Sequence, residues 1–197
     1  MDLVARAQAI LMKPKEEWVK IKGESTSIAQ LFTSYAAILA AVPAVAQFIG
    51  NGLVGKKIPF VGWVRYPLGS ALFQAILYYI FTLVSVYIFG IVINALAPSF
   101  GSKQNLPNAM KLAVYSMTPM WIGGVFYIIP FLGFLAILAS LYGLYILYLG
   151  FDNPLMDTPK EKILGYLLVS IVVIVVLSLV VLLVLGAIFT VGTIGGI

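Results

Sequence analysis

The sequence predicts an all-α membrane protein: a polytopic bundle of five transmembrane helices with a cytoplasmic N-terminus and short N-terminal interfacial helices. Hydrophobic residues make up 62% of the 197 residues and charged residues only 10%, whereas about a quarter of a soluble domain is charged. Long runs lack Asp, Glu, Lys and Arg, and the longest is interrupted near its middle by Pro130. A soluble core of this length could not bury so much apolar surface, so lipid is the expected solvent.

Residues 1–27 are predicted to lie at the cytoplasmic interface as two short helices. The apolar residues of the first half recur at helical spacing: Leu3, Ala7, Ile10 and Leu11. That pattern favours an amphipathic helix over residues 2–13. Pro14 suits the first turn of a second helix, and Gly23 can end it. The pair is an interfacial anchor or a docking site for a cytosolic partner. Ser27 and Gln30 fit a capping box at the start of the first span.

Residues 28–197 are predicted to form the five-span domain. A bilayer core of about 30 Å needs roughly 20 apolar residues in a helix. The runs without charged residues that meet this length are 25–55, 66–102, 112–151 and 163–197. The first, second and last each hold one span, at about 28–50, 70–96 and 163–185. The segment between the first two spans is expected to be an interfacial loop or a short re-entrant piece.

The run 112–151 is long enough for two helices of about 20 residues. Pro130 lies near its middle and is followed by Gly133. Proline has no N–H to continue a helix, so a break is expected there. We predict a tight hairpin of two spans, 112–129 and 131–150. One kinked helix that dips back into the membrane is the alternative.

The distribution of basic residues predicts the orientation. Nine Lys and Arg lie in the N-terminal segment and in the loops before the third and fifth spans, and three lie on the other side. Cytoplasmic loops carry the excess of basic residues. The N-terminus is therefore expected in the cytoplasm and the C-terminus outside.

The composition excludes several chemistries. The sequence has no His and no Cys, so it cannot form a Ser-His-Asp or Cys-His nucleophile or an ordinary zinc site. No charged residue lies within a predicted span, which argues against a proton-coupled pump. We expect a protein that is not an enzyme, with no cofactor, no metal and no nucleic-acid partner.

Polar residues inside the spans are the remaining candidates for a cavity. They are Gln47, Gln74, Asn94 and Ser116. Such side chains line a polar path or hydrogen-bond neighbouring helices. Tyr142, Tyr145 and Tyr148 share roughly one face of the fourth span. They form an aromatic belt with interhelical packing, or line a cavity for a lipid or amphiphile.

Several segments resemble one known family. Three segments resemble the core of that family: 113–119 (Ala-Val-Tyr-Ser-Met-Thr-Pro), 129–133 (Ile-Pro-Phe-Leu-Gly) and 145–150 (Tyr-Ile-Leu-Tyr-Leu-Gly). Two more, 154–162 and 11–18, resemble its outer parts. In this order and spacing the segments resemble the prokaryotic branch of the Yip family, the Ypt-interacting proteins. The family residues carried over to this chain are Tyr115, Ser116, Pro119, Pro130, Gly133, Gly150, Thr158 and Pro159.

The resemblance implies a five-span fold with a cytosolic N-terminus. In eukaryotes, family members are membrane adaptors for Rab-type GTPases, but their long cytosolic N-terminal domain and their Asp-Leu-Tyr-Gly-Pro motif are not found in this sequence. Pro119 is expected to kink the third span or to expose a carbonyl near Tyr115 and Ser116. Thr158 and Pro159 are expected to begin the last span, with Thr158 as its cap.

Two functions follow as hypotheses. The first is a non-enzymatic adaptor or organiser in a prokaryotic plasma membrane, acting through helix packing and lateral association. Its partners would be membrane lipids, other membrane proteins or a second copy of the chain. The second is a small transporter or channel, with a polar path among Gln47, Asn94 and Tyr115 opened by kinked helices.

Overall fold

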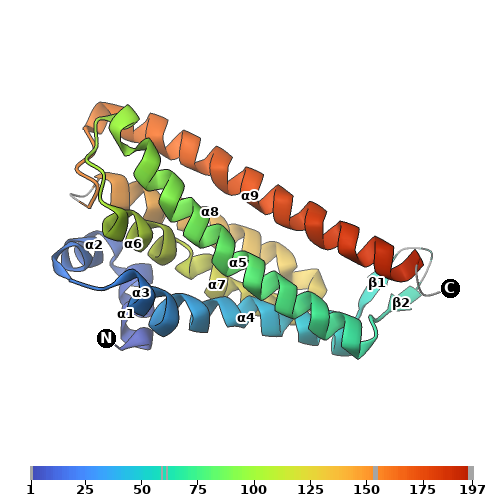
Figure 1. Ribbon diagram of the computed structural model, residues 1–197. Coiled ribbons are helices and arrows are strands. Elements are labelled where there is room, and N and C mark those ends of the chain that lie inside the picture. Colours follow the sequence, from blue (N-terminus) through green and yellow to red (C-terminus); the bar gives the residue numbers. More distant parts are fainter. Residues whose placement is uncertain (1, 59, 61, 153–154, 195–197) are drawn as a thin grey trace.

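Four helical segments are long and apolar enough to cross a bilayer in the computed structural model, which describes residues 2–58, 60, 62–152 and 155–194. They are Ile28–Val54, Leu68–Phe100, Pro130–Asp152 and Lys160–Ala187. These segments run side by side along one axis (Figure 1). The all-α membrane prediction is thus confirmed in its main feature, while five spans and a cytoplasmic N-terminus remain predictions.

The N-terminal residues form the two short helices that their sequence predicts. Helix α1 spans Leu3–Met12, and the Asp2 carboxylate accepts a hydrogen bond from the backbone N–H of Val4 at 3.0 Å. Helix α2 spans Pro14–Gly23, with proline in its first turn. The Ser27 hydroxyl then accepts from the N–H of Gln30 at 3.1 Å, as expected of a helix cap.

The first span is one continuous helical rod with two wider turns. It consists of α3 (Ile28–Leu31), the π-helical η1 (Phe32–Ala36), α4 (Ala37–Phe48) and the π-helical η2 (Ile49–Val54). Strands β1 (Lys56–Ile58) and β2 (Gly62–Val64) follow as an antiparallel pair. The predicted interfacial loop is therefore a short hairpin, which is the one departure from an all-α fold among the described residues.

The second span is the long helix α5 (Leu68–Leu96), extended by the 3-10 turn η3 (Ala97–Phe100). Gly101 follows in the left-handed region with φ 72°, which glycine adopts without strain. This span returns to the end of the bundle that carries α1 and α2 (Figure 1).

The predicted third span, 112–129, is not one continuous helix. It consists of α6 (Leu106–Ser116), α7 (Thr118–Gly123) and the 3-10 helix η4 (Gly124–Ile128). The physical reason is Pro119, which has no backbone N–H to donate to the carbonyl four residues before it. None of these pieces alone could cross a bilayer.

The chain breaks at Pro130, as predicted, and the last two long helices, α8 and α9, follow this break. Ile129 is extended, with φ −111° and ψ 102°, and the 3-10 turn η5 (Pro130–Gly133) leads into α8 (Phe134–Asp152). Helix α9 (Lys160–Ile194) lies at the periphery. Only 6% of its most apolar stretch is buried, against 28–39% for the other three segments.

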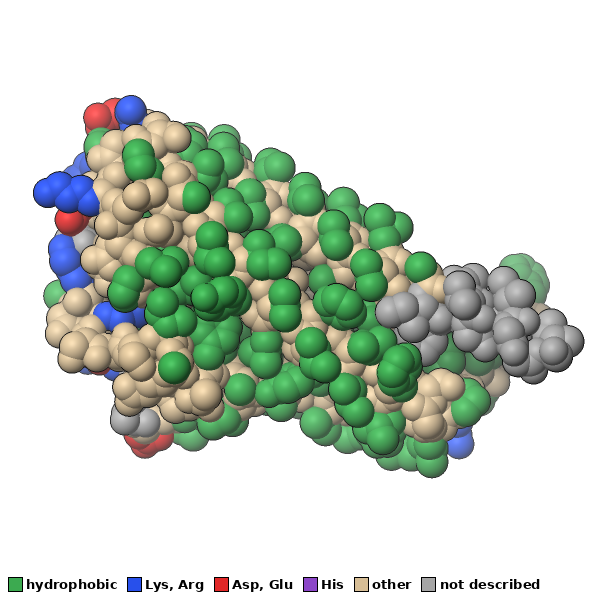
Figure 2. Space-filling model, viewed as in Figure 1, with side chains coloured by type: hydrophobic (Ala, Val, Ile, Leu, Met, Phe, Trp, Pro, Cys, Tyr) green, Lys and Arg blue, Asp and Glu red, His purple; other side chains and the backbone are tan. Residues whose placement is uncertain are grey.

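The core is centred on α6, near one end of the bundle. Residues 109–116 of α6 are all buried, and α6 packs against α5 and α8. We call this end the basic end; it holds α1, α2, the loop 101–105 and residues 155–159 before α9. Figure 2 shows charged side chains gathered there, whereas the flanks of the bundle are covered by apolar side chains.

Candidate functional site

The N-terminal helices are fixed to the bundle by a buried ion network. Arg6 is 7% exposed and forms ion pairs with Glu17 of α2 and with Glu24 just beyond it. Glu17 is 5% exposed and also pairs with Lys20, at 3.2 Å. A charge buried in this way is tolerated only with a partner, so α1 and α2 are held together through Arg6.

Lys111 of α6 contacts the same region from the side of the bundle core. Its Nζ donates to the backbone carbonyl of Ile21 at 2.9 Å and to that of Glu24. These carbonyls lie at the C-terminal end of α2, where the helix dipole favours a cation. Burial lowers the pKa of Lys111, and the nearby Glu24 opposes that shift. Lys111 therefore caps α2 and anchors it on the bundle core.

Tyr115 lies one turn further along α6, fully buried beneath the network. Its ring meets the rings of Trp18 and Tyr35 edge-on, with centroids 6.2 and 4.9 Å away. The guanidinium of Arg6 lies 5.8 Å from the Tyr115 ring centroid, within the range of a cation–π interaction. The motif residue Tyr115 thus links the N-terminal helices to the membrane-embedded core.

The neighbours of Tyr115 extend these links to two further helices. Trp18 donates its indole N–H to the carbonyl of Ile146 on α8 at 3.1 Å. The Tyr35 hydroxyl lies 2.8 Å from the hydroxyl of Thr118, at the start of α7. Segments from four parts of the chain therefore converge on one aromatic and ionic cluster.

Ser116 and Pro119 mark the break in the third predicted span. Helix α6 ends at Ser116 and α7 begins at Thr118, so the kink expected at Pro119 is observed. Helix α8 approaches the break closely, because a Cβ on Gly143 would lie 2.8 Å from the Ser116 carbonyl oxygen. The Ser116 hydroxyl is buried and has no hydrogen-bond partner among the described residues.

Four other motif residues have structural contacts. Gly150 lets α8 pack against Leu112 and the Trp18 ring, whereas Pro130 and Gly133 form the turn before α8. Pro159 packs against Gly101.

Thr158 has a role different from the predicted cap. Its hydroxyl lies 2.8 Å from that of Ser102, so it ties the turn before α9 to the loop after η3.

The polar path among Gln47, Asn94 and Tyr115 is not supported by their positions. Gln47 interacts with Tyr78 of α5. Asn94 lies sixteen residues beyond Tyr78 on the same helix, which is about 24 Å along its axis. Tyr115 is enclosed by the aromatic cluster. The cavities found among the described residues are lined mostly by apolar side chains instead.

The tyrosines of α8 line none of the four cavities described above. Tyr142, Tyr145 and Tyr148 are 36%, 45% and 37% exposed, and the Tyr142 hydroxyl donates to the carbonyl of Leu11 at 2.6 Å. Their arrangement is that of an aromatic belt with packing, the first of the two interpretations above.

The ion network itself is not predicted from the sequence, where Arg6 counts only as one of the basic residues of the N-terminal segment. One feature of the sequence does indicate that Arg6 is buried. Arg6 lies three residues after Leu3 and four before Ile10, so it shares the apolar face of α1. A charged residue on the buried face of a helix needs a buried partner of opposite charge.

Comparison with known proteins agrees with this architecture. The family model described as Yip1 domain matches residues 9–191. "Inner membrane protein YohC" of Escherichia coli K12 is 29% identical over 117 residues, 59% of this chain and 60% of that protein. The protein of the same name from the O6:H1 strain CFT073 matches equally. The match thus spans about 60% of the length of these curated relatives. No solved structure matches the chain.

The family match covers the broken span, the turns that carry Pro130 and Pro159, and the ion-network residues Glu17, Glu24 and Lys111, whereas Arg6 lies before its first residue. Together with the long apolar helices, it identifies the chain as a multi-pass membrane protein and a member of the Yip1 domain family.

Proposed function

We propose that this protein is a non-enzymatic adaptor or organiser of a bacterial inner membrane, which binds a protein partner through its cytoplasmic surface and associates laterally through α9. The membrane assignment is taken from the name of the E. coli relatives. The excess of Lys and Arg at the basic end supports its placement in the cytoplasm.

The observation that carries the proposal is a contact between two separate segments of the basic end. Lys22 Nζ of α2 lies 3.3 Å from Asp157 Oδ1, in the turn before α9. This pair joins the short N-terminal helices and the turn into one continuous surface, which we call the platform. The buried network beneath it fixes α1 and α2 before any partner arrives, and preorganisation lowers the entropic cost of binding.

The exposed side chains of the platform suit a protein partner. Val4, Val19 and Met12 are 58%, 58% and 80% exposed, and basic residues such as Lys13 lie between them. Apolar side chains rimmed by charges are typical of interaction sites. The basic balance favours a partner with an acidic surface.

Photocrosslinking in native membranes tests the proposal. A photoreactive residue at Val19, on the platform, should give a discrete protein adduct. The matched control is Leu138, which is 56% exposed on α8 and should meet lipid. If Val19 gave no adduct, or the same diffuse products as Leu138, the adaptor role would be rejected.

The charge reversal Lys22→Asp should reduce the Val19 adduct at least severalfold, because it places two carboxylates at the junction of the platform. The swap Lys22→Asp with Asp157→Lys should restore the adduct. An exposed pair contributes at most about 1 kcal/mol to stability, so thermal unfolding should hardly change. A loss of adduct that the swap does not rescue would argue against the junction.

Cysteine labelling tests the five-span orientation. The chain has no Cys, so single substitutions can be labelled uniquely with an impermeant maleimide. We expect Cys at Lys13, Gln104 and Lys160 to be labelled only from the cytoplasmic side, and Cys at Lys57 only from outside. Labelling of Gln104 and Lys57 from the same side would contradict this topology.

A further inference from the structure

The end of the bundle opposite the basic end carries positive charge with no acidic side chain nearby. All seven Asp and Glu of the sequence lie in residues 2–24 or 152–161, which belong to the basic end. Three of the twelve Lys and Arg lie at the opposite end, in or next to strands β1 and β2: Lys56, Lys57 and Arg65. Every acidic side chain of the sequence is thus a whole span away from these three cations.

The helices on either side place strands β1 and β2 at the membrane surface. The first span ends at Val54 and the second begins at Leu68, so the segment between them connects two spans at one face of the bilayer. The first span has 27 residues and is about 40 Å long, the thickness of a bilayer with both headgroup layers. The pair β1 and β2, which we call the β-hairpin, therefore lies at the level of lipid headgroups.

One face of the β-hairpin combines a cation with an aromatic ring. Lys57 is paired with Trp63 in the register of the two strands, and cross-strand neighbours project from the same face of a sheet. Both side chains are exposed, that of Trp63 to 71%. This pair matches the chemistry of a headgroup layer, where tryptophan is enriched and anionic lipids attract lysine.

Arg65 is held at the base of the β-hairpin. It lies against Gly55, because a Cβ on Gly55 would lie 2.6 Å from Cγ of Arg65. Gly55 has φ 82°, which glycine adopts without strain. The Nε of Arg65 donates to the carbonyl of Val54 at 3.3 Å. This bond orients the guanidinium, and its terminal N–H groups suit the oxygens of a phosphate.

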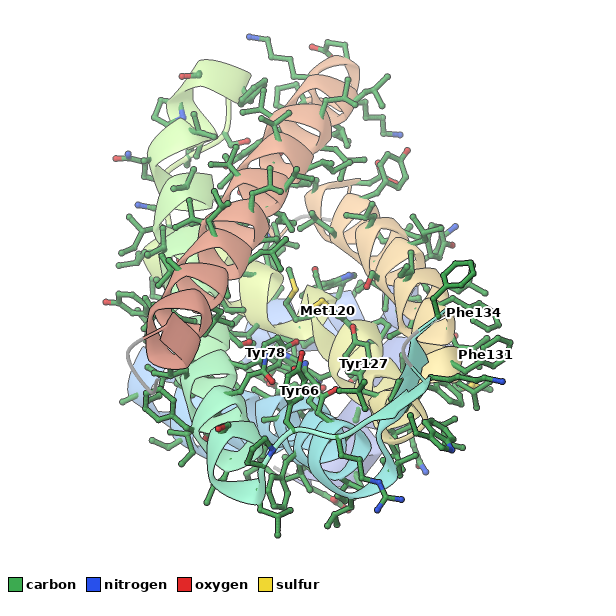
Figure 3. All side chains as sticks on the ribbon, turned by 90° about the vertical axis from the view of Figure 1, so that its right-hand side faces the viewer. Tyr66, Tyr78, Met120, Tyr127, Phe131 and Phe134 are labelled. Atoms are coloured by element: carbon green, nitrogen blue, oxygen red, sulfur yellow. The ribbon has the colours of Figure 1, made fainter. Side chains whose placement is uncertain are left out.

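Exposed aromatic side chains at the same end favour lipid over a soluble partner. Phe60, in the turn between the strands, is fully exposed and has φ 67°. Phe131, in the turn before α8, is 84% exposed. Figure 3, viewed from this end, shows Phe131 and Phe134 extending outward from the bundle. Exposure of such rings to water is costly, whereas acyl chains next to the headgroups can cover them.

We propose that the β-hairpin binds an anionic phospholipid of the adjacent leaflet, whose phosphate pairs with Lys57 and Arg65 while its interfacial region surrounds Trp63. Each cation near an anionic lipid surface increases the attraction about fivefold. An acidic soluble protein would also match the charge, but it would leave the aromatic rings in water. The β-hairpin is at the opposite end from the platform, so this site does not depend on the adaptor role.

Quenching of tryptophan fluorescence by brominated lipid tests the site. Trp63 is exposed, whereas Trp18 and Trp121 are 0% exposed. The full chain is reconstituted in vesicles of equal parts phosphatidylglycerol and phosphatidylcholine, with bromine near the headgroup end of the chains of one lipid or the other. The Trp63 signal, the difference between wild type and Trp63→Phe, should be quenched severalfold more efficiently by brominated phosphatidylglycerol. Equal quenching by the two lipids would overturn the site.

Two double variants make the test specific. Lys57→Gln with Arg65→Gln should abolish the preference for phosphatidylglycerol, and Lys57→Gln alone, which leaves the bond between Arg65 and Val54 in place, should reduce it. Lys103→Gln with Lys160→Gln removes two exposed cations from the basic end and should keep the preference. If both double variants lost it, the overall charge of the protein would attract the lipid and the proposed site would be wrong.

Two further measurements distinguish the lipid from other ligands. Replacing chloride by inorganic phosphate at constant ionic strength should leave the preference unchanged, and its loss would assign the cations to soluble phosphate. A photoreactive residue at Phe60 should give lipid adducts in native membranes. A discrete protein adduct there would assign the β-hairpin to a protein partner and overturn the lipid site.

Discussion

Arg6→Met is expected to be the most damaging single substitution at the basic end, lowering the free energy of unfolding by about 3–5 kcal/mol, the cost of breaking a buried ion pair from one side. The variant leaves Glu17, 5% exposed, facing Glu24 without the guanidinium that separates them. Because Glu24 is partly exposed, most of this loss should come from Glu17. Thermal unfolding in detergent micelles measures the loss.

Two comparisons make the Arg6 prediction specific. Adding Glu17→Gln to Arg6→Met should recover part of the stability, because the buried carboxylate, which keeps only the exposed Lys20 as its ion-pair partner, is then gone. The control Lys13→Met removes a cation that is 70% exposed and 3.9 Å from its partner Glu16, and should change little. If Arg6→Met and Lys13→Met behaved alike, the network would not stabilise the fold.

Gly50→Ala is expected to destabilise the opposite part of the bundle by about 1–3 kcal/mol or more, the usual cost of overpacking. A Cβ at Gly50 would overlap the backbone carbonyl of Tyr127 and also meet that of Ile128 at 3.2 Å. Backbone atoms cannot move aside as the end of a flexible side chain can. The first span and η4 would therefore have to separate, which unfolding midpoints and limited proteolysis near residue 128 would detect.

Gly69→Ala is the matched control for Gly50→Ala. Gly69 also lies in a helix, but a Cβ there meets nothing within 4 Å. Replacing a helical glycine by alanine at an open site typically stabilises a protein by about 0.4–1 kcal/mol. An equal loss of stability for both variants would show that the contact between Gly50 and Tyr127 is not tight.

The membrane class and most helix ends could be predicted because they depend on local chemistry. The length of an apolar run decides whether a helix can span the bilayer. Pro14, Gly23 and Pro130 lie at helix ends in the structure, as their residue types predict. The ends of α5 and α8 lie within a few residues of the predicted spans 70–96 and 131–150. The broken third span was predicted only as a kink, since the effect of one proline depends on what packs around it.

The ion network could not be predicted, because it depends on residues far apart in the chain. Arg6 and Glu24 are eighteen residues apart, and Lys111 is eighty-seven residues beyond Glu24. One sequence does not say which of its charges are buried together. Likewise, the sequence does not show that the Ser116 hydroxyl, unlike those of Ser140 and Ser178, forms no bond to the carbonyl four residues before it.

The broken element formed by α6, α7 and η4 has a consequence for biogenesis. Irregular backbone in hydrocarbon is tolerated only where protein covers it, and here α8 supplies that cover through the close approach of Gly143 to Ser116. A nascent chain that had emerged only as far as residue 128 would have α4 and α5 beside this element but would still lack α8. The translocon would therefore have to release this element into lipid together with α8, as a pair, so that its maturation waits for synthesis of the helix that follows it.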